Sequence, residues 1–279
     1  MGKSQKFTEK EFERMIDLYN QGYSSVKIGQ MFNAPASSVA GYIKRRIGVL
    51  RSNKVNSRLY TCDGSCFESI DTPEKAYWLG FIYADGYLSN SNKKKIFGLS
   101  LAKKDREHLC KLRSFLKATN PISEYISTRG YSKGKPYVRM IIHDYELYDN
   151  LLKNGVFLRK TLILKKPNIP NELKSHFIRG YFDGDGCLTC SSLKDNGLQF
   201  KVKIVGVKDI LDYIKEFIES NTDIRIKKYY KRRKSDKVYS LDVSGNYQNK
   251  EILDLLYKDS TVCLERKCNK YKKLCSHLS

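Results

Sequence analysis

The feature that most constrains the fold of this chain is a nine-residue segment that occurs twice, one hundred residues apart. Residues 78–86 read WLGFIYADG and residues 178–186 read IRGYFDGDG. A helix-start signal precedes each copy, Thr72-Pro73 for the first and Pro170-Asn171 for the second. Each copy ends on an acid and a glycine, so both are predicted to be helices that end at a C′ glycine.

The sequence after each copy repeats as well. Each copy reads α-β-β-α-β-β-α over about 95 residues, with period-2 strands and amphipathic helices in the same order. The predicted strands are 87–89, 96–101, 122–128 and 137–142 in the first copy, and 187–189, 200–205, 224–230 and 239–243 in the second. Two such copies predict one pseudo-twofold α+β domain, not a long solenoid.

Small residues stand four apart in both segments, Gly80 with Ala84 and Gly180 with Gly184. This spacing puts a smooth stripe on one face of each helix, so two helix backbones can approach closely. The acids that follow, Asp85 and Asp185, face the negative end of the helix dipole at a cost of roughly 0.3–1 kcal/mol.

If the helices cross along their stripes, the two carboxylates meet near the pseudo-twofold axis. They then repel each other unless a proton or a divalent cation lies between them. A few oxygen ligands with open positions suit Mg²⁺.

The charge of the chain points to a polyanionic partner. The 279 residues hold 52 Lys and Arg against 30 Asp and Glu, a formal net charge of +22. With 41% hydrophobic residues the chain is expected to fold, so the surplus lies on a folded surface. DNA or RNA is the simplest partner; a merely soluble basic protein is the alternative.

Other classes of protein are disfavoured. No apolar run approaches 18 residues, which excludes a membrane span, and no secretory signal is visible. The eight cysteines are therefore expected to be free thiols in a reducing compartment. Zinc is disfavoured because Cys62-x₃-Cys66 and Cys187-x₂-Cys190 lie far apart and no His has a matching spacing.

The first 50 residues predict three short helices. Thr8 and Glu11 form a capping box, with Phe7 and Phe12 as a hydrophobic staple. The apolar positions are Met15, Ile16, Leu18 and Tyr19 in the first helix and Val26, Ile28, Met31 and Phe32 in the second. The third helix is expected to carry Val39, Ile43 and Ile47 inward. The pattern resembles a helix-turn-helix, with a helical bundle that only packs as the alternative. The third helix would read DNA with Ser37, Ser38, Tyr42, Lys44, Arg45 and Arg46.

The two nine-residue segments, each followed by the same strand and helix series, resemble the LAGLIDADG homing endonucleases in their single-chain, two-repeat form. The resemblance covers roughly residues 71–279. It implies an α+β fold, a pseudo-twofold pair of αββαββα repeats with saddle-shaped antiparallel sheets, preceded here by a small all-α helix-turn-helix domain. The expected domains are residues 1–50 (helix-turn-helix), 51–70 (linker), 71–165 (first repeat) and 166–279 (second repeat).

The family's metal-binding catalytic acid stands at the eighth motif position, which is Asp85 in the first copy and Asp185 in the second. The resemblance implies that these two acids share two or three Mg²⁺ ions. The sixth position differs between the copies, Tyr83 against Asp183, and is not the catalytic acid in the family.

The family also places basic residues late in each repeat, near the active sites. The matching residues are Lys160 and Lys267, expected to polarise water or to offset transition-state charge. Contact with the phosphate backbone or with solvent is the alternative for both.

In this family the strands form two saddles that lie in the DNA major groove. Basic and apolar residues alternate along 200–205 and 224–230, so one face suits the helices and the other suits DNA. The expected DNA contacts are Lys201, Lys203, Arg225, Lys227, Tyr229 and Lys231. Lysines placed there for solubility are the alternative.

The resemblance thus implies a site-specific homing endonuclease that makes metal-dependent double-strand breaks in a long DNA target. It implies a monomer that binds double-stranded DNA, with no obligate protein partner and no membrane. Its expected place is the cytoplasm of a bacterial or phage-infected cell, or an organelle matrix. Two functions on the same fold stay open: an RNA maturase that assists intron splicing, and a non-catalytic DNA-binding transcription regulator, which retention of both acids disfavours.

Overall fold

The computed structural model describes residues 7–21, 23–48, 50, 60–91, 94–128, 130–158, 164–193, 197–231 and 237–278. The chain divides into two compact units, Met1–Thr61 and Cys62–Ser279. Within the described ranges, no helix has both the length and the apolar character that a membrane crossing requires.

The first unit holds three helices, α1 (Glu9–Asn20), α2 (Ser25–Met31) and α3 (Ala36–Ile47). The predicted capping box is present at Thr8 and Glu11, and the rings of Phe7 and Phe12 meet with centroids 5.7 Å apart. The turn between α2 and α3 is tight. A Cβ atom on Gly29 would come within 2.5 Å of the Ala34 carbonyl oxygen.

Met15, Tyr19, Ile28, Val39 and Ile43 form the core of this unit. The expectation that Ile47 packs inward was wrong, and two apolar residues of α2 are exposed as well. Val26 is 57% exposed, Met31 50% and Ile47 40%. Val26 lies about 200° around its helix from Ile28, whereas Met31 and Ile47 are the last residues of their short helices, where less neighbouring structure covers them.

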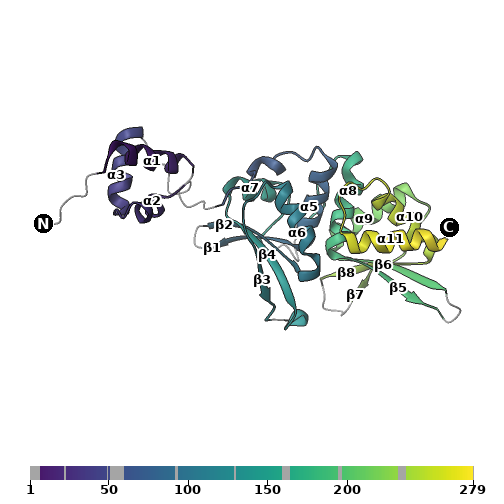
Figure 1. The fold of residues 1–279 in the computed structure, drawn as a ribbon. Helices are drawn as coiled ribbons and strands as arrows, with labels where there is room; N and C mark the ends of the chain where they lie inside the picture. Colours follow the sequence, from purple (N-terminus) through teal and green to yellow (C-terminus); the bar gives the residue numbers. More distant parts are fainter. Residues whose placement is uncertain are drawn as a thin grey trace. The chain divides into compact units, whose positions relative to one another are not determined.

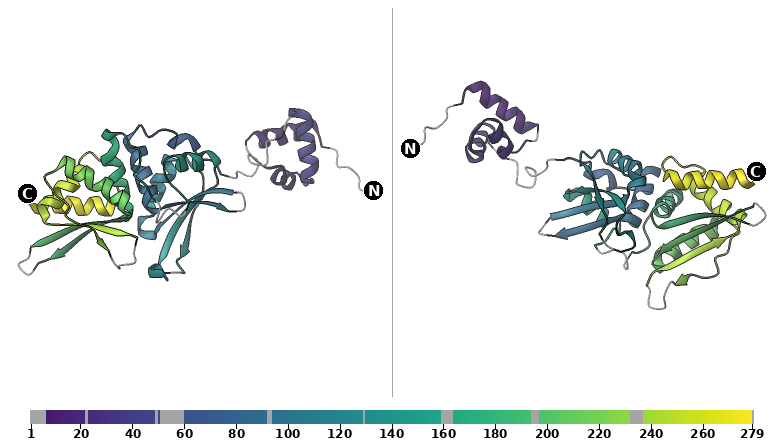
Figure 2. Two further views of the ribbon diagram at one scale, coloured as in Figure 1. Left: turned by 180° about the vertical axis from the view of Figure 1, so that it is seen from behind. Right: turned by 60° about the horizontal axis from the view of Figure 1, so that its bottom comes forward.

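The second unit contains the two repeats, each with a four-stranded antiparallel sheet. The first sheet has the order β1-β2-β4-β3 and the second β5-β6-β8-β7, so the strand order is the same in both repeats. Helices cover one face of each sheet and leave the opposite face, called here the open face, uncovered (Figures 1 and 2).

The elements of the first repeat are η1 (Gly64–Phe67), α5 (Pro73–Asp85), β1 (Gly86–Ser91), β2 (Lys94–Ala102), η2 (Lys103–Asp105), α6 (Arg106–Phe115), β3 (Ile122–Ile126), η3 (Gly130–Ser132), β4 (Pro136–Ile142) and α7 (Tyr145–Lys153). Those of the second are η5 (Asn171–Leu173), α8 (Lys174–Asp185), β5 (Gly186–Ser192), β6 (Leu198–Gly206), α9 (Lys208–Asn221), β7 (Tyr230–Lys231), β8 (Tyr239–Ser244), α10 (Asn246–Tyr257) and α11 (Glu265–Leu278).

This order confirms the predicted α+β pair of repeats, with two differences in the second. The strand predicted over 224–230 is reduced to β7, which pairs only Tyr230 with Ser240 and Lys231 with Tyr239. Helix α11 was not predicted. It packs Tyr271 and Leu274 against the core, at helical spacing that the sequence does show.

The stretch predicted to be a linker, residues 51–70, divides between the two units. Residues 51–59 lie outside the described ranges. Cys66, Phe67 and Ile70 are buried in the core of the second unit, where η1 contacts α7.

The repeats meet where α5 crosses α8. A Cβ atom on Gly80 would overlap the carbonyl oxygen of Phe177, and one on Gly180 would overlap that of Tyr77. The two clashes are reciprocal, as the pseudo-twofold arrangement requires. No residue with a side chain fits at either position, which explains the glycine at the third position of both motifs.

The glycines that end the motif helices serve a different purpose from the one predicted. Gly86 has φ −74° and Gly186 φ −87°, so neither adopts the left-handed conformation of a C′ glycine. Each helix instead runs directly into the first strand of its sheet. A Cβ atom on Gly86 would come within 2.8 Å of the Ile82 side chain, and one on Gly186 would overlap Phe182.

His108 is a core residue of α6 that packs against the first motif helix. It is 3% exposed, and its ring lies against Tyr77, Trp78 and Phe81. Its Nε2 lies 2.9 Å from the Tyr77 hydroxyl, which itself donates to Asp183. A hydroxyl has one proton to donate, so His108 must be the Nε2–H tautomer. Burial lowers the pKa of His108 to about 3.

Replacement of Gly180 by Val should lower the free energy of unfolding of the second unit by at least about 3 kcal/mol, because the side chain meets backbone that cannot move aside. Urea unfolding followed by the fluorescence of Trp78, the one tryptophan of the chain, measures this. Gly197→Ala is the control, because its Cβ would be 3.5 Å from the nearest atom. A loss below about 1 kcal/mol for Gly180→Val would contradict the close crossing.

The buried His108 should make stability depend on pH. The unfolded chain takes up a proton near pH 6.5 and the folded chain only near pH 3. The free energy of unfolding should therefore fall as pH drops below 6.5, by up to about 1.4 kcal/mol per pH unit.

His108→Gln keeps an N–H donor for Tyr77 but does not titrate, so this part of the slope should disappear. Urea titrations of both proteins between pH 7 and 4.5 measure it. Parallel curves for the two proteins would refute the buried neutral histidine.

Candidate active site and nucleic-acid interface

The two motif helices bring their acids together. Asp85 is the last residue of α5 and Asp185 the last of α8, and both are half-buried. A Cβ atom on Gly184 would overlap the Ala84 side chain and lie 3.2 Å from Oδ2 of Asp85. The acid of the first repeat therefore lies against the motif helix of the second, next to the residue that precedes Asp185.

Tyr181 lies beside both acids, and the sequence analysis did not single it out. It is 1% exposed, and its hydroxyl donates to the carbonyl of Val205 at 3.0 Å. Its pKa is raised well above the ordinary value, first by burial and then by the negative charge of Asp185, and the charge of Asp85 adds to the effect. One buried phenol thus interacts with both acids. The sequence did carry a signal for this residue: the fourth motif position has a hydroxyl in Tyr181, whereas the first copy has Phe81 there.

The structure places Lys267 away from the position expected of a residue that contacts substrate. It is 2% exposed in the first turn of α11. Its ammonium donates to three carbonyl oxygens at the end of α8, those of Phe182, Asp183 at 2.8 Å and Gly186 at 2.5 Å. An ammonium has three protons, so none remains for water or phosphate in this arrangement. Burial lowers the pKa of Lys267 to about 8, and the charge of Asp183 opposes that shift.

Lys160, the other lysine expected near the active site, lies outside the described residues. Among the residues that the structure does describe, no three His, Cys, Asp or Glu side chains come together as a metal site. The candidate ligands for a metal are thus the pair Asp85 and Asp185.

Asp183 is fully buried at the sixth motif position. Its carboxylate accepts hydrogen bonds from the hydroxyl of Tyr77 at 2.8 Å, the hydroxyl of Tyr257 at 2.5 Å and the backbone N–H of Leu264 at 2.7 Å. Burial raises its pKa, and the charge of Lys267 opposes that shift. This acid organises the interior and does not face solvent, which agrees with its assignment as a non-catalytic position.

Arg179 lies one helical turn before Asp183 and is 1% exposed. Its guanidinium donates to the carbonyls of Val262 at 2.9 Å and Leu256 at 3.0 Å, and lies 5.2 Å from the centre of the Tyr77 ring. Arg179 and Asp183 together hold the segment that joins α10 to α11. The sequence analysis missed this role, although two ionisable residues four apart in an apolar helix were the signal.

Lys201 and Lys203 lie on the open face of the second sheet, as predicted. Lys201 is opposite Ser244 in the register and Lys203 is opposite Asp242, while Val202 and Ile204 face the helices. The Asp242 carboxylate lies 3.0 Å from the Lys201 ammonium and 4.0 Å from that of Lys203. One acid therefore offsets part of the charge of these two lysines.

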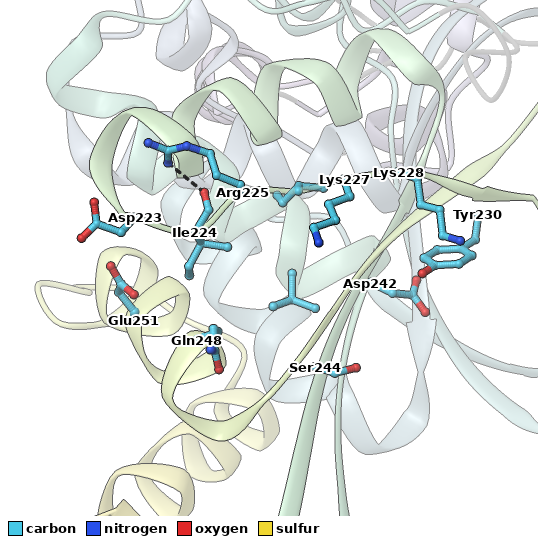
Figure 3. A pocket seen from close by; sticks show the side chains of 12 residues that line it. Asp223, Ile224, Arg225, Lys227, Lys228, Tyr230, Asp242, Ser244, Gln248 and Glu251 are labelled. Atoms are coloured by element: carbon cyan, nitrogen blue, oxygen red, sulfur yellow. Dashed lines mark hydrogen bonds between the residues drawn. The ribbon is translucent and has the colours of Figure 1, made fainter.

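The segment that precedes β7 is held by α9 and not by β8. The guanidinium of Arg225 donates to the carbonyl of Thr222 at 3.0 Å, and the backbone N–H of Ile226 donates to Glu219 at 2.7 Å. A groove of about 530 Å³ lies between this segment and β8, and Lys227 lines it (Figure 3). Arg225 therefore caps a helix, whereas Lys227 is exposed.

The other two expected contacts on this segment point toward the helices. The hydroxyl of Tyr229 donates to Asp212 of α9 at 2.6 Å. Lys231 pairs with Tyr239, which lies on the same face of β8 as the buried Leu241 and Val243. The Lys231 ammonium lies 4.9 Å from the centre of the Tyr239 ring. The predicted positions of Tyr229 and Lys231 on the DNA-facing side of the strand were thus wrong. The irregular backbone after α9 shifts the alternation of side chains by one residue, so Tyr230 lies on the open face instead.

Most other side chains on the open faces are uncharged, and the sequence analysis did not select them. Their placement follows from the register, which alternates them with the buried residues of each strand. The first sheet also carries Lys94 at the start of β2 and Arg139, whose guanidinium lies 5.3 Å from the Tyr125 ring. The uncharged polar residues are Tyr87, Ser89, Ser100, Ser123, Tyr125, Tyr137, Cys187, Thr189, Ser191, Gln199, Tyr230, Ser240 and Ser244.

In the first unit, two of the six expected contacts of α3 face another helix. The ring of Tyr42 stacks on that of Phe12, with centroids 3.5 Å apart. Arg46 donates to the Tyr42 hydroxyl at 3.0 Å and pairs with Glu9. The other four, Ser37, Ser38, Lys44 and Arg45, are exposed, and so is Arg46 despite its contacts.

Comparison with known proteins finds a family match in the first repeat. Residues 72–154 match the family described as LAGLIDADG-like domain. No curated protein sequence matches the chain. The chain is also similar to solved structures of three LAGLIDADG proteins.

The LAGLIDADG meganuclease I-AabMI, bound to uncleaved DNA, is 15% identical with TM-score 0.48, over 74% of this chain and 90% of that one. The LAGLIDADG homing endonuclease I-GzeII, in complex with its DNA target, is 12% identical with TM-score 0.49, over 75% and 89%. I-LtrWI, bound to target DNA, is 12% identical with TM-score 0.48, over 74% and 90%.

The motif of residues 78–86, the strands behind it and the family match agree: residues 72–154 of this chain form a LAGLIDADG-like domain.

Proposed function

We propose that this chain is a homing endonuclease that makes metal-dependent double-strand breaks in a long DNA target. The observation that carries the proposal is the convergence of Asp85 and Asp185, one from each repeat, where α5 crosses α8. The two strands of a DNA duplex are themselves related by twofold symmetry. A pseudo-twofold pair of acids therefore matches a pair of phosphodiesters, one on each strand.

Both acids fit a hard divalent cation such as Mg²⁺. They offer carboxylate oxygens, the ligands this ion prefers, and they lie half-buried at the negative ends of two helix dipoles, where a cation is favoured. Asp85 and Asp185 would hold the metal. When bound, such an ion stabilises the attacking and leaving oxygens of an in-line displacement at phosphorus.

The open faces of the sheets are the proposed surface for double-stranded DNA. Strands β1 and β5 begin at Gly86 and Gly186, directly after the two acids, so DNA along the open faces would pass them. Lys201 and Lys203 would contact phosphates or guanine edges. The hydroxyl and amide side chains around them would read base edges by hydrogen bonds.

The first unit is proposed to be a helix-turn-helix that binds DNA beside the cleavage site. The tight turn at Gly29 and the exposed Ser37, Ser38, Lys44 and Arg45 on α3 support this role. Serine hydroxyls and basic groups at a helix surface suit phosphate and base contacts.

Replacement of Asp85 or Asp185 by Asn should convert double-strand cleavage into nicking, and the double variant should not cut, because each acid serves one strand. A target is first selected from a randomised DNA library with Mg²⁺, and cleavage of that target in a supercoiled plasmid is then measured. Binding should remain within about threefold of wild type. Asp259→Asn, an exposed acid elsewhere in the second unit, is the control.

Equal double-strand cleavage by the wild type and the double variant would contradict the assignment of Asp85 and Asp185 as the catalytic acids. Binding without any cleavage by wild type would favour the transcription regulator. Preference for structured intron RNA over the DNA library would favour the maturase.

Replacement of both Lys44 and Arg45 by Ala should weaken DNA binding and shorten the footprint at one end. If each contacts one phosphate, the slope of log K against log salt should become shallower by about 2. Footprinting and binding isotherms at several salt concentrations measure this. The control is Lys10→Ala with Lys27→Ala, two exposed lysines on α1 and α2. The same loss in both double variants would point to general charge and not to a reader helix.

A further inference from the structure

The end of α8 lacks the usual means of satisfying its last carbonyls. Its cap residue Gly186 is extended, with φ −87° and ψ 160°, so the backbone does not turn back to close the helix. The Gly186 N–H donates to Phe182. The carbonyls of the last turn, with Asp185 among them, then need donors from elsewhere in the molecule.

Lys267 meets part of this need, at the Asp183 carbonyl. Its buried ammonium bonds to the carbonyls of Phe182, Asp183 and Gly186, which lie on both sides of Asp185 along the chain. It also puts a positive charge at the negative end of the α8 dipole, where the acid alone would be unfavourable. The lysine therefore fixes the backbone that carries the Asp185 carboxylate.

The position of Lys267 is in turn set by α8. Asp183 accepts the backbone N–H of Leu264, the residue just before α11, and the hydroxyl of Tyr257 at the end of α10. Arg179 holds the carbonyl of Val262 in the same segment. The motif helix thus holds the segment that delivers the lysine, and the lysine holds the end of the motif helix.

The first repeat has no match for the two charged members of this arrangement in its motif helix. Leu79 stands at the position of Arg179, and Tyr83 at that of Asp183. The Tyr83 hydroxyl donates to the carbonyl of Asn154 at 2.7 Å. The second motif helix thus carries two charged side chains at positions where the first has Leu79 and Tyr83.

We propose that Lys267 is a positioning residue for Asp185, and that it serves the hydrolysis of one DNA strand only. This inference rests on the proposed nuclease function. It differs from the expectation for a lysine near the active site, because Lys267 acts through the helix end and touches neither phosphate nor water. Removal of its contacts should loosen the backbone that carries Asp185. Asp85 interacts with the Lys267 charge but lies on the other motif helix, so its backbone should keep its position.

The test compares wild type with Lys267→Met, in which the stem stays but the donors and the charge are lost. Each strand of a selected target is labelled separately and cleaved with Mg²⁺. Lys267→Met should slow one strand at least tenfold and the other less than threefold, so that nicked DNA accumulates. Binding of the target in Ca²⁺ should change less than threefold, because the open faces are untouched.

Hydrogen exchange on the free protein gives a second readout that needs no DNA. The amide of Gly186, at the end of α8, should exchange at least tenfold faster in Lys267→Met. The amide of Gly86, at the end of α5, should not change. A residue that only stabilised the whole unit would raise both rates together.

Arg266→Ala is the matched control. Arg266 precedes Lys267 in the same turn and pairs with Asp105 of the first repeat at 3.0 Å, but no contact of it with the end of α8 is seen. The Arg266→Ala protein should cut both strands at wild-type rates. If Lys267→Met does not fold, Lys267→Arg replaces it. The planar guanidinium keeps the charge but cannot direct three donors to one point, so the same strand should be slowed to a smaller extent.

Equal slowing of both strands, or unchanged exchange at Gly186, would overturn the positioning role. If wild-type protein cuts no DNA under any condition, the proposed function fails first. That outcome is visible in the wild-type arm alone and is distinct from an inactive variant.

Discussion

The second unit depends on one close contact, the crossing of α5 over α8. Side chains normally hold two helices 8–10 Å apart, but here Gly80 and Gly180 each face a backbone carbonyl of the other helix. The crossing joins the two repeats into one core and sets the distance between the two helix ends. Because each acid is the last residue of its helix, the same contact brings Asp85 and Asp185 together.

The crossing is nearly symmetric, but the structure around it is not. The second motif helix carries Arg179 and Asp183 where the first has Leu79 and Tyr83. Burial of two ionisable groups is costly unless each is fully hydrogen-bonded. Here the cost is offset by bonds to the segment between α10 and α11, and this segment leads into α11 with its buried Lys267.

Patterns that repeat along the chain could be read from the sequence, and contacts between distant segments could not. The motif helices, seven of the eight strands and the Thr8 capping box follow from local spacing and were predicted. The partners of Lys267 could not be predicted, because they depend on how the first turn of α11 meets a helix some eighty residues earlier in the chain. Tyr229 and Lys231 were misplaced because one irregular backbone segment reverses every side chain after it.

The surplus charge of +22 has a different place from the one that the sequence suggests. On the described strands, the basic residues of the open faces are Lys94, Arg139, Lys201 and Lys203, and Asp242 offsets two of these four. Most of the remaining open-face residues are serines, threonines, tyrosines and other uncharged groups. Charged groups attract any DNA sequence, whereas hydroxyls and amides discriminate base edges. Under the proposed function, a surface that recognises one long target would gain from few lysines that are held in place, and most of the positive charge would then raise affinity from outside the open faces.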